Sequence, residues 1–161
     1  MREPRIRPLA AGLLALIALV ALASAGCGQK KITECNALVA VINTGVVGLE
    51  KAPKNEADPS GVSDLKAMAT SMDGVAAETA SVQLTITELK KLRDEYQKMA
   101  KDIAKAEREL ASAAQEQSAA GDPDKRAQAV ARRNAAEQTL DAAVKQEDPL
   151  VDQINKFCQT P

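Results

Sequence analysis

The chain has three cysteines, and these are the residues whose side-chain chemistry is most informative. Cys27 follows a run of small residues, whereas Cys35 and Cys158 lie near the two ends of the sequence that follows. The 161 residues include no histidine, which excludes a histidine-based metal site and a Ser-His-Asp catalytic site. No phosphate-binding loop, metal-ligand spacing or nucleophile motif is present. We therefore expect no catalytic residue, no metal and no cofactor, and we do not expect an enzyme.

The N-terminal sequence has the three parts of a secretory signal peptide. Arg2, Arg5 and Arg7 form a basic region, and residues 9–23 form an apolar run. Small residues then lead directly to Cys27. A basic region, a short apolar core and a small-residue cleavage site are typical of an export signal.

This segment resembles the lipobox of bacterial lipoprotein precursors. Gly26 and Ala25 match that pattern, while Ser24 stands where the family usually has Leu. The resemblance implies that residues 1–26 are removed, that diacylglycerol is attached to the thiol of Cys27, and that the new amino terminus is acylated. Gly28, which is not Asp, implies the outer membrane rather than the inner one.

Two alternatives to the lipid anchor remain open at this point. The segment could be an ordinary signal peptide in which Cys27 has no special role. It could also be an uncleaved membrane helix, although the apolar run is shorter than the roughly 20 residues that a spanning helix needs. If Cys27 carries the lipid, the membrane is one binding partner of the protein. Residues 27–32 are then expected to be a tether between the lipid and the helices.

Export also bears on the other two cysteines, because exported proteins fold in an oxidising compartment. Cys35 and Cys158 are therefore predicted to form a disulfide. Two free, buried thiols are the alternative. The chain has no Cys-x-x-Cys motif, which makes a redox-active pair the weaker interpretation.

Composition predicts helices and excludes several partners. The chain contains 31 alanines, and 21 basic residues nearly balance 22 acidic ones. Alanine favours helix, whereas a near-zero net charge and only two aromatic residues argue against nucleic-acid binding.

Apolar residues recur at steps of three and four, which predicts four helices. The first is expected over residues 33–51 with Thr33 as its N-cap, and the second over 62–81 with Ser63 or Asp58 as the cap. A capping box of Thr85 and Glu88 predicts a break at residues 82–84, against the alternative of one continuous bent helix over 62–119.

The two later helices are predicted to form a longer hairpin. The third carries an a/d heptad seam, made of Leu89, Leu92, Tyr96, Met99, Ile103, Ala106, Leu110 and Ala113. Gly121 is expected at the C′ position of that helix, with Asp122 as the next N-cap and Pro123 in the first turn. The inner face of the fourth helix is expected at Val130, Leu140, Val144, Val151, Ile154 and Cys158, with a kink or restart at residues 148–149.

Short connections favour an up-down-up-down helical bundle over residues 33–158, followed by a tail of residues 159–161. This order places the start of the first helix beside the end of the fourth, where the two cysteines lie. The tip near residue 121 is expected to project away from the membrane as a bare two-helix hairpin.

Four basic residues near the tip are the candidate interaction patch for an acidic partner: Lys125, Arg126, Arg132 and Arg133. The alternative is an ordinary solvated face balanced by Glu107, Glu109 and Glu116. Similarly, Met68, Met72, Met99 and Tyr96 are interpreted as core residues rather than a binding groove.

These observations predict a lipid-anchored envelope protein that acts through contact with an unidentified envelope protein or as a structural spacer. The alternative is a carrier or sensor that binds an apolar ligand or lipid between its helices.

Overall fold

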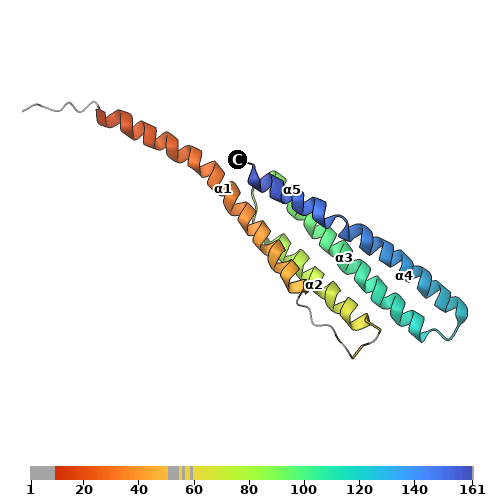
Figure 1. Ribbon diagram of the computed structural model, residues 1–161. Coiled ribbons are helices and arrows are strands. Elements are labelled where there is room, and N and C mark those ends of the chain that lie inside the picture. The colour runs from red at the N-terminus through yellow and green to blue at the C-terminus, as the bar shows by residue number, and fades with distance from the viewer. Residues whose placement is uncertain (1–9, 51–54, 56, 59, 161) are drawn as a thin grey trace, which may run out of the picture.

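The computed structural model describes the backbone of residues 10–50, 55, 57, 58 and 60–160, and side chains from Gly28 onward except Glu50. The described part is all-helical. Its five helices are α1 (Ala10–Glu50), α2 (Val62–Ser81), α3 (Thr87–Ala119), α4 (Pro123–Val144) and α5 (Glu147–Gln159). The chain forms an up-down-up-down bundle in which α3 and the α4–α5 unit make the longer antiparallel hairpin (Figure 1).

The first helix is longer than the sequence pattern indicates. α1 is continuous through Thr33, so the expectation that Thr33 caps a new helix is wrong. The Thr33 hydroxyl instead donates to the carbonyl of Gln29, 2.9 Å away, one turn earlier in the same helix. Residues 27–32, expected as a tether, have helical backbone and belong to α1. The first part of α1 therefore extends away from the bundle, past the end of α5 (Figure 1).

The part of α1 over Gly28–Leu49 is apolar, with a mean hydropathy of 1.5, and long enough to cross a membrane by length and composition. Core helices pass the same test, and this segment contributes Cys35, Leu38 and Ile42 to the core of the bundle. Packing against α2, α3 and α5 buries part of this segment, while Ile32 and Val47 stay exposed.

The short connection between α2 and α3 determines where α2 lies along α3. The helix break is confirmed, but residues 82–86 form an extended linker, with Val82 and Leu84 buried in the core. Five extended residues span about 16 Å. The linker therefore shifts α2 away from the start of α3 and towards the far end of the molecule.

This shift changes the expected shape of the hairpin tip. Lys66 near the start of α2 donates to Gln115 near the end of α3, with 3.3 Å between Nζ and Oε1. Asp73 of α2 and Arg108 of α3 form a salt bridge along the same face. The outer end thus contains α2, α3 and α4, and the expectation of a bare two-helix projection is wrong (Figure 1).

α3 and α4 meet through small residues. The buried residues of α4 are Ala129, Ala136 and Ala143, spaced seven apart. Small side chains at the contact allow two helices to approach closely. Val130 is 36% exposed and Val144 is 48% exposed, so placing these valines on the inner face is wrong. The bulkier core residues resume in α5, where Leu150 and Ile154 are buried.

The turn at the tip follows the sequence signals in part. Asp122 caps α4, and its Oδ1 accepts the backbone N–H of Asp124 at 2.7 Å, with Pro123 in the first turn. Gly121 does not adopt the left-handed conformation expected at a C′ position. The end of α3 is closed instead by Arg126, whose guanidinium donates to the carbonyl of Ala120 at 2.9 Å. α5 restarts at Glu147, slightly before Pro149.

In the loop before α2, an acidic side chain also accepts backbone hydrogen bonds. Asp58, one of the two expected caps, accepts the N–H of Ser63 at 2.7 Å. Gly61 has φ 68°, a left-handed conformation that favours glycine, and α2 begins directly after it. Hydrogen bonds from Ser60 and Ser63 lower the pKa of the Asp58 carboxyl below its usual range. The loop is thus built around a charged acceptor at a helix N-terminus, where the helix dipole favours it.

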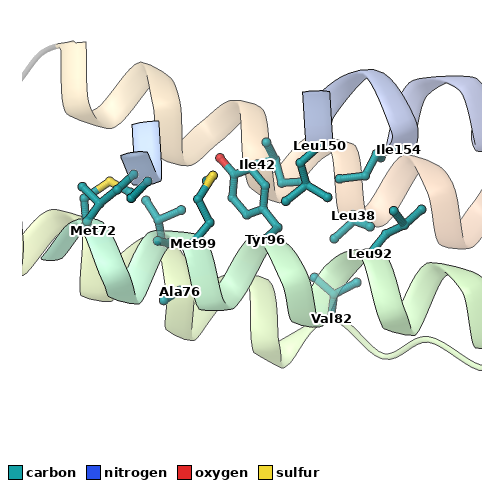
Figure 2. Packing of buried hydrophobic residues seen from close by; sticks show 14 of the residues in the cluster. Leu38, Ile42, Met72, Ala76, Val82, Leu92, Tyr96, Met99, Leu150 and Ile154 are labelled. Atoms are coloured by element: carbon teal, nitrogen blue, oxygen red, sulfur yellow. The ribbon is translucent and has the colours of Figure 1, made fainter. Parts of the chain in front are cut away.

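The core lies between α1, α2, α3 and α5. Figure 2 shows Tyr96 of α3 beside Met99 and close to Ile42 and Leu150. Tyr96, Met72 and Met99 are buried core residues, as expected, whereas Met68 is 42% exposed. Burial, together with the nearby negative charge of Glu147, raises the pKa of Tyr96 to about 12, so its hydroxyl stays protonated.

Two glycines of α1 provide a matched test of this packing. A Cβ placed on Gly45 would lie 2.7 Å from Cγ2 of Val75 in α2, whereas nothing lies within 4 Å of one on Gly48. Gly48→Ala is expected to raise the free energy of unfolding by up to about 1 kcal/mol through helix propensity. Gly45→Ala is expected to be less stable than Gly48→Ala by about 1–3 kcal/mol through overpacking. Urea unfolding measures both, and equal effects would show that α1 and α2 do not meet here.

Candidate functional surfaces and the closed base

A disulfide closes one end of the bundle. Cys35 of α1 and Cys158 of α5 are bonded, with their Cα atoms 5.7 Å apart and 123 positions of sequence between them. The start of the packed part of α1 therefore lies against the end of the last helix, as the up-down-up-down order requires. We call this end, formed by residues 28–35 of α1, the linker 82–86 and the last turn of α5, the base.

The base is also held by the carboxylate of Glu34. Its Oε2 accepts the backbone N–H groups of Thr85 at 2.9 Å and Ile86 at 3.0 Å, and its Oε1 accepts the Thr85 hydroxyl at 2.5 Å. A residue from α1 thus satisfies the donors that precede α3. The expected local capping box is wrong, because Thr85 bonds to Glu34 rather than capping α3 together with Glu88.

The hydrogen bonds from Thr85 and Ile86 lower the pKa of Glu34 from its ordinary value of 4.5. Glu34 therefore contributes stability that is present above the ordinary pKa and is lost as the pH falls through the lower, folded-state pKa. Glu34→Ala is expected to lower the unfolding midpoint and to speed hydrogen exchange at the amides of Thr85 and Ile86.

Glu88→Ala is the matched control for this prediction, because Glu88 is exposed and belongs to the local capping box. We expect the Glu88 variant to leave the exchange rates of Thr85 and Ile86 nearly unchanged. A larger effect at Glu88 than at Glu34 would contradict the tertiary cap and restore the local one.

A third contact ties the chain end to α1. The ammonium of Lys31 donates to the carbonyl of Thr160 at 2.6 Å and lies 4.5 Å from the centre of the Phe157 ring. This places residue 31 level with the end of α5. Disulfide, carboxylate cap and lysine contact together fix α1 at the base by three different kinds of interaction.

The side chain of Cys27 lies outside the described residues, as does all of residues 1–9. The backbone at Cys27 is helical and belongs to α1, eight positions before the disulfide-bonded Cys35. A group attached to Cys27 would therefore stand at the edge of the base, about two helical turns before Cys35.

The candidate basic patch is largely occupied by local partners. Arg132 pairs with Glu116 of α3 at 2.5 Å, and Arg133 pairs with Glu137 of its own helix at 2.9 Å. Arg126 closes the end of α3. Lys125 and Arg132 line the same shallow hollow between α3 and α4, while Arg133 does not line it. Arg126, Arg132 and Arg133 thus have contacts within the bundle.

Glu107, expected to balance that basic surface, is instead buried. It is 2% exposed, and within the described part of the chain its Oε2 has no hydrogen-bond partner. Burial raises its pKa from 4.5 to about 7. Since α2 and α4 both pack along α3, this helix buries a second row beside its heptad seam, formed by Ala100, Ala104, Glu107 and Ala111. The alanines on either side were the signal that could have placed Glu107 inside.

The hollows on the bundle are lined by both charged and apolar side chains. One of about 270 Å³ lies between α3 and α4, where its charged lining residues are Asp102, Lys105, Glu109 and Arg132. Another of about 310 Å³ lies near the α4–α5 break and includes Glu95, Lys98 and Lys145. Among the described residues, no group of three or more acidic or cysteine side chains is placed to hold a metal ion.

No protein-family model, curated protein or solved structure matches this chain.

Proposed function

We propose that this protein is a lipid-anchored component of the bacterial cell envelope that acts by protein–protein contact or as a structural spacer, without catalysis. The observation that carries the proposal is the position of Cys27 in α1, eight residues before the disulfide at the base. Acyl chains on Cys27 would hold the base next to the membrane, because each buried CH₂ contributes about 0.8 kcal/mol. The far end of the hairpin would then be presented away from the bilayer.

The fourth helix is the surface best suited to a partner. α4 packs against α3 through its alanine row. Its opposite face is exposed and consists mainly of small or amide side chains, namely Ala127, Ala131, Asn134, Gln138 and Ala142, with Asp124 and Asp141 towards its two ends. Val130 and Val144 are exposed beside it. A helix face of small residues allows a second helix to approach closely, as α3 already does on the other side.

The anchor is tested by the intact mass of the protein extracted from bacterial membranes. We expect a species that begins at Cys27 and carries a diacylglyceryl group, and usually a further acyl chain on the amino terminus. A species that begins at Cys27 without acyl mass, or one that retains residues 1–26, would contradict the anchor. The outer membrane is the expected destination, and density-gradient separation of the two membranes tests it.

The contact surface is tested by site-specific photocrosslinking in the native envelope. A photoreactive residue at position 131, on the exposed face of α4 opposite α3, is expected to capture a discrete envelope protein. The matched control is position 67, an exposed alanine of α2. The same products from both positions, or no product from 131, would contradict a contact surface on α4. Capture of lipid alone would favour the alternative of an apolar-ligand carrier.

A further inference from the structure

A second basic cluster lies at the base, and its members differ from the basic residues near the tip. Lys30 and Lys31 stand in α1 and Lys156 in the last turn of α5. Within the described part of the chain, no salt bridge involves these three lysines, whereas Arg132 and Arg133 near the tip are both paired. We call Lys30, Lys31 and Lys156 the base lysines.

Within the base, three lysines accompany one acidic residue, Glu34, and Asp152 lies one turn before Lys156 in α5. Glu34 is buried, and its two oxygens accept the donors of Thr85 and Ile86. Glu88 is exposed in the first turn of α3. The base therefore carries an excess of positive charge, although the whole chain has a net charge of −1.

Helix geometry sets the distance of these lysines from Cys27. At 1.5 Å per residue, Lys30 lies about 4.5 Å and Lys31 about 6 Å beyond Cys27 along α1. Cys158 is level with Cys35, about 12 Å beyond Cys27, and Lys156 stands two residues earlier in the antiparallel α5. Lys30 and Lys31 therefore lie within the Debye length of about 10 Å at 0.1 M salt, while Lys156 lies about 15 Å from Cys27 along the axis.

An exposed apolar side chain stands among them. Ile32, next to Lys31, is 53% exposed although it lies in the segment that leads into the core. Lysines together with an exposed isoleucine are typical of a surface that binds lipid headgroups. The ammonium groups contact the phosphates, and the apolar side chain enters the membrane interface.

We propose that the base is a docking surface for anionic phospholipid headgroups, contacted through Lys30, Lys31, Lys156 and Ile32. The inference rests on the proposed anchor at Cys27 and adds a defined orientation of the bundle relative to the membrane. The lipid holds the protein at the membrane, while the base lysines hold the bundle with its base against the surface. Juxtamembrane lysine clusters gain affinity from each charge, at about fivefold per lysine near an anionic surface.

The test uses the full acylated protein, purified from membranes and reconstituted into vesicles of phosphatidylglycerol or phosphatidylcholine. A membrane-impermeant amine reagent labels the outward-facing protein, and peptide mass spectrometry gives the rate at each lysine. We expect labelling of Lys30 and Lys156 to be about fivefold slower in phosphatidylglycerol vesicles. The protection should disappear in about 1 M salt, where the Debye length is about 3 Å.

Exposed lysines away from the base are the internal controls, namely Lys101 of α3 and Lys125 of α4. Their labelling should be equal in both vesicles. Equal labelling of Lys30 and Lys156 in both vesicles, from protein that floats with them, would overturn the docking surface and leave the anchor intact. Protection in native membranes but not in phosphatidylglycerol vesicles would overturn it in favour of an acidic protein partner. Protein without acyl mass that does not float would overturn both proposals.

Discussion

Replacing Cys35 and Cys158 together by alanine is expected to lower the free energy of unfolding by about 5 kcal/mol. The disulfide joins positions 123 apart, so it removes much of the conformational freedom of the unfolded chain. Few other contacts offset its loss at the base, because α5 has only 13 residues and two of them, Leu150 and Ile154, are buried. For a domain of ordinary stability, this loss is a large fraction of the total free energy of unfolding.

Urea unfolding of the oxidised, reduced and doubly substituted protein measures this effect. The reduced wild-type protein should behave like the double variant, and hydrogen exchange should rise first in α5 and in the amides around Cys35. Exchange in the middle of α3, at Ala104 and Ala111, should change less, because α2 and α4 cover it independently of the bridge. Equal urea midpoints for oxidised and reduced protein would contradict the role of the disulfide as the main constraint on the base.

Glu107 is expected to make the bundle less stable as the pH rises from about 4.5 to about 7. Burial raises the pKa of its carboxyl from 4.5 to about 7. Between these two values the folded protein holds a proton that the unfolded chain has released, so the free energy of unfolding falls with rising pH. The total loss approaches about 3 kcal/mol and is complete above the folded-state pKa.

Glu107→Gln removes the titration while keeping the size of the side chain. We expect the variant to be more stable than the wild type at about pH 8 and similar to it at about pH 5. Glu109→Gln, an exposed neighbour on the same helix, is the matched control and should follow the wild-type curve. Burial and the nearby Asp148 also raise the pKa of Glu147, so the difference between wild type and variant isolates Glu107. Parallel curves for Glu107→Gln and wild type would show that this carboxyl is not held neutral.

The two predictions concern different parts of one elongated molecule. The disulfide acts at the base, next to the proposed anchor, whereas Glu107 lies in the outer part, where α4 contributes only alanines to the core. A rise in pH towards neutrality is therefore expected to destabilise the outer end first. The α4 face that we propose as a contact surface lies along this same region.

Strong local patterns in the sequence predicted most of the architecture. The 3–4 spacing gave the helices, Asp122 and Pro123 gave the start of α4, and the heptad seam of α3 was correct from Leu89 to Ala113. The cysteine pairing was also predicted, because an exported chain with two remaining thiols at the ends of an up-down-up-down bundle has one simple way to join them.

What the sequence failed to predict depends on groups that are distant along the chain. Glu34 caps the start of α3 from another helix, and no local pattern links it to Thr85. The extended linker 82–86 shifts α2 outward, so α3 is covered on two sides and buries Glu107 in a second row. Alanines rather than valines face inward on α4, because α3 and α4 approach so closely that only small side chains fit at their contact. Local spacing thus determined where the helices form, while the packing of helix against helix decided which polar groups are buried and which apolar ones are left exposed.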